Sequence, residues 1–194
     1  MTELEEGPAE GGPLGNALPP LAAEDHRCAG CDLFYPDVTV ERAVASIRGV
    51  PAAARVAALA VPLAKRRERP ASGTWSVAEH VCHLRDVYVT YTIRLHRART
   101  EGRPRLEPML NDLRARRFRY NEQDVSPVLD ELALVVAGFC DEVARTTDWG
   151  RPVTRLPGEQ RTALWLVRQA MHEGVHHVRD IRDAGEGATS PRRG

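Results

Sequence analysis

Apolar residues recur along most of the chain at the three- and four-residue spacing of an α-helix, and no segment sustains the strict alternation of a β-strand. Prolines, glycines and capping residues divide this pattern into long segments. The long helices that we expect span residues 39–67, 76–101, 126–146 and 162–183. The first should break near Pro51, because proline lacks the backbone N–H that a helix interior requires. The pattern therefore predicts a mostly α-helical protein.

The connections between these helices indicate the architecture. Ser76 and Ser126 stand where N-caps are needed, and Pro127 suits a first helical residue. The connection before Ser126 is long, rich in Arg and Pro, and carries a short helical piece near residues 108–118. Four helices with one long crossover predict an all-α four-helix bundle. Its core should contain Leu84, Tyr88, Leu132, Val136, Phe139, Leu164, Val167, Met171 and Val175.

Composition separates the bundle from its flanks. Residues 1–25 and 184–194 contain mainly Gly, Pro, Ala and charged residues without apolar periodicity, so we expect two disordered tails. An arm with a Cys-x-x-Cys pair occupies residues 26–38, and the bundle occupies residues 39–183. A chain of 194 residues fits one such domain.

Charge and hydropathy exclude several classes of partner. The 27 basic side chains balance 27 acidic ones, which removes any global attraction to nucleic acid or to an anionic membrane. No window approaches the roughly 18 apolar residues of a membrane helix. The N-terminal segment is acidic, unlike a secretory or transit peptide. We therefore expect a cytoplasmic protein that has no nucleic-acid or membrane partner.

The last predicted helix carries the densest set of metal-ligand side chains. His172, Glu173, His176 and His177 fall within six residues. Residues four apart share a helix face, so either His172 with His176 or Glu173 with His177 can present two ligands together. The second pair borders the apolar face, whereas the first points toward solvent. The spacing alone permits both pairs.

The second helix can supply a third ligand from His80 or His83. Periodicity favours His80 as the inward residue. Three nitrogen or oxygen ligands from two facing helices would leave an open position for water or a substrate thiolate, which is the arrangement that a catalytic metal site needs.

Two further motifs suggest other chemistry. The segment from His172 to His176 matches the HExxH motif of metalloproteases, but few residues follow it to supply a third ligand, so this alternative is remote. Cys28 and Cys31 have the spacing of half a zinc knuckle or a redox pair, but the chain contains no second Cys-x-x-Cys pair. We expect an ordered turn there, with at most a partial metal site, outside the principal site.

Motifs on the second and last helices resemble those of the DinB superfamily, which includes the mycothiol-dependent maleylpyruvate isomerases. The motifs are Trp75-Ser76, Glu79, His83-Leu84, Glu173, His177 and Asp180-Ile181. The resemblance covers about residues 40–183 and implies a four-helix bundle that binds a divalent metal, usually zinc or nickel. The implied ligands are one His of the second helix and an i, i+4 pair of the last helix.

Carried over residue by residue, the resemblance implies that His83, Glu173 and His177 are the metal ligands. It disagrees with the periodicity on the second helix, where His80 remains the alternative. A register slip of one residue on the last helix would select His172 and His176 instead.

The resemblance also implies an activity. Where reactions are known in the superfamily, they are transfers or isomerisations that use a low-molecular-weight thiol such as mycothiol, and a metal makes that thiol a stronger nucleophile. We therefore expect a transferase or isomerase that takes a small-molecule substrate and a thiol cosubstrate, in a chain that can form a homodimer. A non-catalytic metal-binding or stress-response bundle is the alternative.

Overall fold

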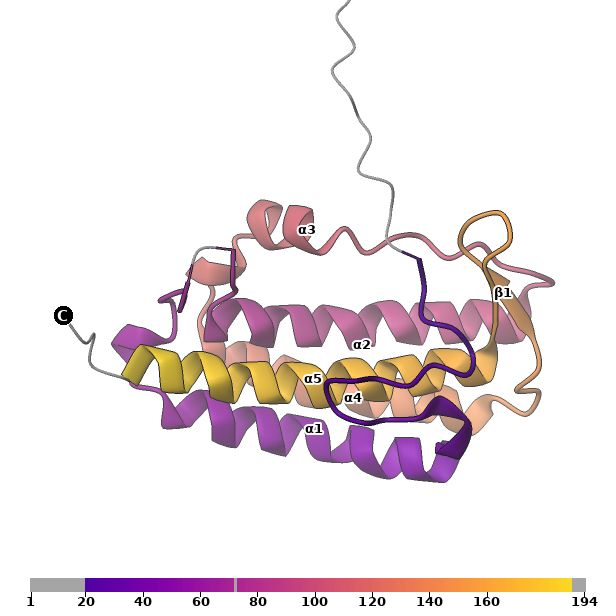
Figure 1. Ribbon diagram of the computed structural model, residues 1–194, viewed down its shortest axis with the longest axis horizontal. Coiled ribbons are helices and arrows are strands. Elements are labelled where there is room, and N and C mark those ends of the chain that lie inside the picture. The colour runs from indigo at the N-terminus through magenta and orange to yellow at the C-terminus, as the bar shows by residue number, and fades with distance from the viewer. Residues whose placement is uncertain (1–19, 72, 190–194) are drawn as a thin grey trace, which may run out of the picture.

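The fold is described from a computed structural model, which covers residues 20–71 and 73–189. Four long helices run side by side along the molecule (Figure 1), and this arrangement confirms the predicted all-α four-helix bundle. The long helices are α1 (Val40–Ala60), α2 (Val77–Thr100), α4 (Val125–Arg145) and α5 (Ala163–Thr189). The shorter helical elements are η1 (Tyr35–Asp37), η2 (Leu63–Lys65), α3 (Asn111–Arg117) and η3 (Tyr120–Glu122).

The four helices are not packed in the order of the sequence. α5 packs against both α1 and α2, and α4 packs against the same two helices. α1 and α2 therefore lie on one diagonal of the bundle. The crossover between α2 and α4 carries α3 and runs above α2 in Figure 1. As a result, α2 and α5 lie side by side although they are distant in sequence, and they can share a site.

Capping residues explain where two of the helices begin. Ser76 accepts a hydrogen bond from the backbone N–H of Glu79, and the Glu79 carboxylate accepts one from the backbone N–H of Ser76. This reciprocal capping box starts α2 at the predicted place. α4 begins slightly earlier than predicted, because Asp124 rather than Ser126 is its N-cap.

The predicted break at Pro51 is wrong, because α1 passes through this residue without interruption. Proline removes one backbone hydrogen bond from a helix interior. Ile47, Val50 and Ala54 lie on either side of it and are buried in the core. Burial of this apolar face therefore outweighs the lost hydrogen bond. The helix ends at Ala60, before the expected end at residue 67.

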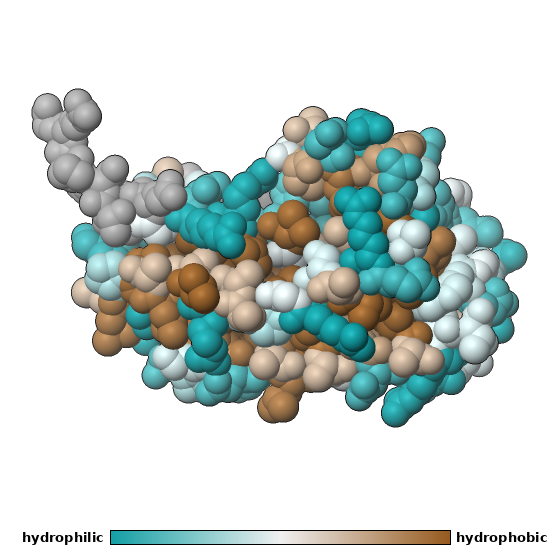
Figure 2. Space-filling view, turned by 90° about the horizontal axis from the view of Figure 1, so that it is seen from below, coloured by the Kyte–Doolittle hydropathy of each residue, from teal (hydrophilic) through white to brown (hydrophobic). Residues whose placement is uncertain are grey.

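α1 also corrects the expectation about membrane helices. By length and composition, it is the one helix in the described part of the chain that could cross a bilayer. The expectation looked for an uninterrupted run of apolar residues, whereas the mean hydropathy of α1 stays high although the helix contains Pro51 and Arg55. One face of α1 packs into the bundle. A helix in the core of a protein can have the same length and mean hydropathy as a membrane helix. Seen from below, the molecule shows hydrophobic and hydrophilic residues intermixed (Figure 2).

The sequence pattern did not predict a short β-hairpin that precedes α5. β1 (Pro152–Thr154) and β2 (Gln160–Thr162) pair in antiparallel register, with Pro152 opposite Thr162. Strands of three residues are too short to show a recognisable alternation of apolar and polar positions. The hairpin leads the chain directly into α5.

The predicted tails need correction where the structure describes them. Residues 20–25 are ordered, and the backbone oxygen of Ala22 accepts a hydrogen bond from Trp165 Nε1 at 3.0 Å. α5 continues to Thr189, beyond the expected end at residue 183, because Ala184 still packs into the core. The rest of both predicted tails, residues 1–19 and 190–194, lies outside the described residues.

The predicted core is mostly in place, with two corrections on α5. Val175 is 36% exposed and Leu164 is only half-buried. Trp165, on the side of α5 that the sequence pattern assigns to solvent, is completely buried. The cause is the N-terminal arm, which in the structure comprises residues 20–38, crosses the outer face of α5 (Figure 1) and covers that side of the helix.

Candidate metal centre

Three side chains from α2 and α5 meet between the two helices. His83, Glu173 and His177 each offer a ligand atom, and these atoms lie within 4.8 Å of one another. The rings of His83 and His177 have their centroids 4.5 Å apart. His83 is 1% exposed, and neither of its ring nitrogens has a hydrogen-bond partner among the described residues. The structure thus brings together the three residues that the family resemblance implies.

His177 is held in place from both sides of its ring. Its Nε2 lies 3.3 Å from Oε2 of Glu173, and its Nδ1 lies 3.3 Å from Oδ2 of Asp180. The other oxygen of Glu173 accepts a hydrogen bond from Nε2 of Gln169 at 2.8 Å. Such outer contacts orient ligand side chains and keep their lone pairs directed at one point.

The electrostatics of the three residues differ. Burial, with a further contribution from His177, lowers the pKa of His83 to about 3. Burial raises the pKa of Glu173, but its contacts with His177 outweigh burial and lower that pKa to about 2. Burial lowers the pKa of His177, but Asp180 and Glu173 raise it to about 9. At neutral pH the site therefore contains an uncharged His83, a charged Glu173 carboxylate and a protonated His177, which must lose its proton when it binds a metal.

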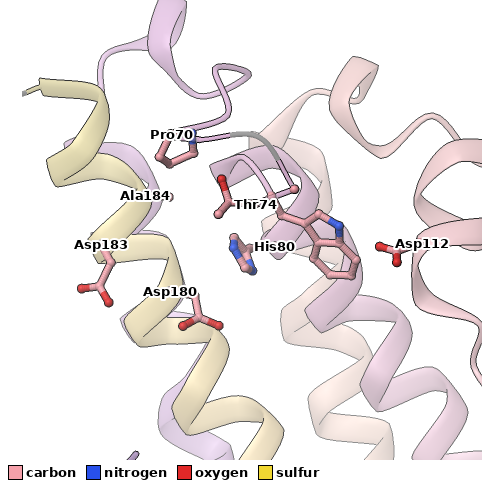
Figure 3. Close-up of a pocket in the computed structure, with 9 residues that line it drawn as sticks. Pro70, Thr74, His80, Asp112, Asp180, Asp183 and Ala184 are labelled. Atoms are coloured by element: carbon pink, nitrogen blue, oxygen red, sulfur yellow. The ribbon is translucent and has the colours of Figure 1, made fainter. Parts of the chain in front are cut away.

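His80 occupies a different place from the one that periodicity predicts. It is half-buried, whereas His83 is the inward residue. Its Nδ1 lies 3.2 Å from Nδ1 of His177, and with Asp180 these two residues form a second group of possible ligands. Figure 3 shows His80 between Asp180 of α5 and the loop that carries Thr74. Buried residues cover much of the circumference of α2, so periodicity does not separate the two histidines, and in the structure His83 is the buried one.

His172 and His176 do not join Glu173. They face the arm, where they form a separate group with Cys28 and Cys31. The prediction that this pair points toward solvent is therefore wrong, because the arm folds back over that side of α5. The HExxH motif is divided between two clusters, since its glutamate and its histidines point to different places.

A pocket of about 420 Å³ opens beside His83 and Glu173. Its walls come from the arm, α2, the crossover, the β-hairpin loop that carries Arg155, and α5. The lining includes Leu21, Ala22, Tyr91, Arg94, Met109, Arg155, Trp165 and Gln169. A small molecule in this pocket would therefore lie next to two of the three metal-ligand candidates.

The sequence analysis did not identify some residues of the site. Gln169 stands four residues before Glu173, and this spacing is a signal that could have identified it as a partner. Trp75 is not one of the missed residues, because the family motif already includes it, and the centroid of its ring lies 4.9 Å from that of the His83 ring. Arg94 and Arg155 carry no distinguishing signal in a chain so rich in arginine, and only the fold places them at the pocket.

The donor set fits a divalent metal. Two imidazoles and one carboxylate are the ligands that zinc accepts in open sites with three protein ligands. This fit rests on the two ring nitrogens of His83, which have no partner within residues 20–71 and 73–189, because a buried imidazole is normally hydrogen-bonded.

The comparisons with solved structures show the same fold. YfiT from Bacillus subtilis, described as a probable metal-dependent hydrolase with an unusual four-helix bundle topology, superposes with a TM-score of 0.68 at 20% identity, over 76% of this chain and 86% of that one. A mycothiol-dependent maleylpyruvate isomerase superposes with a TM-score of 0.61 at 15% identity, over 75% of this chain and 62% of that one.

The comparisons by sequence identify the family. A search of curated proteins gives no match. The sequence profile of the DinB superfamily, however, matches residues 47–181, which span α2, α4, most of α1 and most of α5. That stretch includes every residue of the cluster between α2 and α5. By this match, and in agreement with its fold, the chain belongs to the DinB superfamily.

Proposed function

We propose that this chain is a metal-dependent enzyme that uses a low-molecular-weight thiol, similar to mycothiol, as cosubstrate in a transfer or isomerisation reaction. The observation that carries the proposal is His83, a buried imidazole without a hydrogen-bond partner among the described residues, beside Glu173 and His177. Leaving a buried polar group unpaired costs about 1–3 kcal/mol. A metal bound by this lone pair would remove that cost.

His83, Glu173 and His177 would hold the divalent metal, and zinc or nickel is the proposed ion. Imidazole nitrogens suit both ions. Three protein ligands leave one position of a tetrahedral site open. When bound, the metal would supply a Lewis acid that lowers the pKa of a coordinated thiol or water.

The pocket beside the ligands supports an external nucleophile. Within the described part of the chain, its lining contains no Cys, Ser, Thr or Lys side chain. Cys82 and Cys140 are buried away from it. A reaction here that needs a thiolate nucleophile would therefore take it from a small molecule, in agreement with a thiol cosubstrate.

Two buried arginines support an anionic substrate. Arg94 and Arg155 are each 8% exposed and line the same pocket. Arg155 pairs with Glu159, whereas Nε of Arg94 has no hydrogen-bond partner among residues 20–71 and 73–189. A carboxylate is the acceptor that matches a guanidinium group best. We therefore include a carboxylate-bearing small molecule in the proposal.

The two structural neighbours are described with two different kinds of reaction. One is described as mycothiol-dependent and the other as a probable hydrolase. Hydrolysis by water at the same open position is accordingly the second candidate function. A cytoplasmic location belongs to the proposal as well, because that compartment keeps small thiols reduced.

The geometry disfavours the HExxH metalloprotease alternative. Such an enzyme needs its glutamate next to the metal that the two histidines hold. Here Glu173 lies with His83 and His177, while His172 and His176 face the arm.

Metal analysis of the purified chain, followed by a screen of thiol cosubstrates with electrophilic carboxylic acids, tests the proposal. His83→Ala and Glu173→Ala should remove the metal of this site and the thiol-dependent turnover together. His96→Ala, at an exposed histidine of the same helix, should preserve both. Turnover that survives His83→Ala would contradict the proposal. Tight metal binding without turnover of any thiol would favour the non-catalytic alternative.

A further inference from the structure

A second cluster of metal-ligand side chains lies on the outer face of α5, apart from the site between α2 and α5. Cys28 and Cys31 of the arm and His172 and His176 of α5 each present one ligand atom, all within 4.8 Å of one another. A tetrahedral zinc ion with two sulfur and two nitrogen ligands requires separations of roughly 3.3–3.8 Å between these atoms. Only small side-chain movements separate the observed arrangement from that geometry.

We propose that Cys28, Cys31, His172 and His176 form a structural zinc site that fastens the N-terminal arm to α5. Four protein ligands complete a tetrahedron and leave no position for a substrate, in contrast to the three-ligand site between α2 and α5. The cluster is therefore a structural rather than a catalytic site, and its existence does not depend on the function proposed above.

The arm presents its two cysteines as a zinc-binding turn does. Cys28 and Cys31 lie in a turn at the end of a small hairpin, in which the backbone N–H of Cys28 donates to Leu33 at 2.9 Å. Burial raises the pKa of the Cys28 thiol, but the backbone N–H groups of Cys31 and Gly30 outweigh burial and bring that pKa below its ordinary value. N–H groups directed at the Cys28 sulfur favour its thiolate, which is the form that binds metal. Burial raises the pKa of the Cys31 thiol, so a metal would have to displace the proton of that thiol.

Gly30 allows the turn to approach the helix. A Cβ atom at this position would lie 3.1 Å from Cε1 of His176, which is closer than side chains normally pack. The Sγ of Cys28 reaches Nε2 of His176 at 3.2 Å. Arg179 binds the backbone oxygen of Gly30 at 2.6 Å and so holds the turn on the same face of α5.

The hydrogen bonds around His172 leave one of its nitrogens free for a metal. Gln169 donates to the carboxylate of Glu173, so its amide oxygen must face Tyr35 and accept the only hydroxyl proton of that residue. The contact of 2.9 Å between Tyr35 and Nδ1 of His172 then requires the histidine to donate. Its Nε2 consequently carries a lone pair, and this buried atom has no hydrogen-bond partner among the described residues.

The proposed site has a consequence for the pocket. The arm continues from the cysteine turn back to Leu21 and Ala22, which line the pocket beside His83. A metal that fastens the turn to α5 would also fix this wall.

Zinc content and cobalt absorption of the full chain, kept reduced, test this inference. With both sites filled, we expect two zinc ions per chain, and replacement by Co²⁺ should give the charge-transfer absorption of a cobalt–thiolate bond. Cys28→Ser with Cys31→Ser should lower the content to one ion and abolish that absorption. Cys140→Ala, which removes a cysteine outside the cluster, should change neither.

Two further variants distinguish metal binding at this site from metal binding between α2 and α5, and they show whether a loss of metal comes from a folding defect. His83→Ala should leave the cobalt–thiolate absorption intact even if it removes the metal between α2 and α5. His176→Ala, which keeps both cysteines, should weaken zinc binding at the arm by at least about tenfold, the smallest loss expected for removing a group that orients a ligand. Zinc should also slow amide hydrogen exchange in residues 26–35 of the parent chain and leave it unchanged in the double cysteine variant.

Three results would overturn the inference. They are the absence of cobalt–thiolate absorption in the reduced parent chain, its persistence in the double cysteine variant, and a Cys28–Cys31 disulfide that forms in the presence of zinc.

Discussion

At the scale of single residues, His83 is the clearest sign that this bundle is built for a ligand rather than for stability alone. Its buried imidazole has no hydrogen-bond partner in the part of the chain that the structure describes, and such an unpaired group destabilises the metal-free protein. His83→Leu should therefore leave the metal-free protein as stable as the parent or more stable by about 1 kcal/mol, while it abolishes metal binding. Denaturation in the presence of a chelator measures the first effect.

Leu84→Ala provides the comparison for that variant. Leu84 follows His83 in the sequence and is completely buried, so its truncation should lower the free energy of unfolding by about 2–5 kcal/mol. If His83→Leu destabilises the chelated protein by a similar amount, His83 is an ordinary packing residue and the argument for a ligand fails.

Asp180 acts on the metal centre through another residue. It contacts Nδ1 of His177 and so directs Nε2 toward Glu173. Asp180→Asn should weaken metal binding about 10–100-fold without abolishing it, as titration with a competing chelator would show. Asp183→Asn, one turn further along α5, is the control and should have no effect. If His80→Ala removes the metal instead, the ion binds in the group formed by His80, His177 and Asp180.

At the scale of elements, the contact between α5 and its neighbours depends on a glycine. A Cβ atom at Gly174 would lie within 2.8 Å of Cγ2 of Val50 and closer still to the hydroxyl of Tyr88. Gly174→Ala should therefore destabilise the protein by about 1–3 kcal/mol through overpacking. A Cβ atom at Gly138 in α4 would meet no described atom within 4 Å beyond the backbone of its own helix, so Gly138→Ala should stabilise the protein by up to about 1 kcal/mol. Equal effects of the two substitutions in thermal unfolding would contradict this account.

The crossover is fastened to α2 by a buried carboxylate. Asp86 is 6% exposed and accepts hydrogen bonds from Arg85, from Arg114 of α3 and from Tyr120 of η3. Asp86→Asn replaces charged hydrogen bonds with weaker ones and should cost about 1.5–3 kcal/mol at neutral pH.

The cost of that substitution should depend on pH. Burial raises the pKa of Asp86, but Tyr120, Arg114 and Arg85 outweigh burial and lower it. Its charge therefore stabilises the fold fully above the unfolded pKa of about 3.9, and that contribution is lost as the pH falls through the folded pKa. The difference in unfolding free energy between parent and Asp86→Asn should shrink below about pH 4. A difference that grows on acidification would contradict the lowered pKa.

At the scale of the whole molecule, metal binding should appear as thermal stability. A ligand at about 100 times its dissociation constant stabilises the native state by about 2.7 kcal/mol. For a domain of this size, that corresponds to a rise in melting temperature of roughly 5–11 °C. Calorimetry with and without zinc should show this rise in the parent, and His83→Ala should abolish the part that comes from the site between α2 and α5. An unchanged melting temperature in the parent would argue against binding to the folded chain.

Much of the architecture could be predicted because it depends on local patterns. The start of α2 follows from Ser76 and Glu79, whose side chains cap the backbone within one turn. The predicted break at Pro51 is wrong because the preference of proline against a helix interior is outweighed by burial of α1 against other helices. The local sequence pattern contains no information about that burial.

The sequence by itself determined the fold class, the family and the residue types that could bind a metal, since helical periodicity and motif spacing are properties of neighbouring positions. It left open which i, i+4 pair of the last helix is used and whether His80 or His83 joins it. The tertiary structure placed Glu173 and His177 opposite His83 and turned His172 and His176 toward Cys28 and Cys31. The physical reason is that side chains of α2, α5 and the arm become neighbours only when the chain folds, and the direction from which each element packs decides which face of α5 it meets.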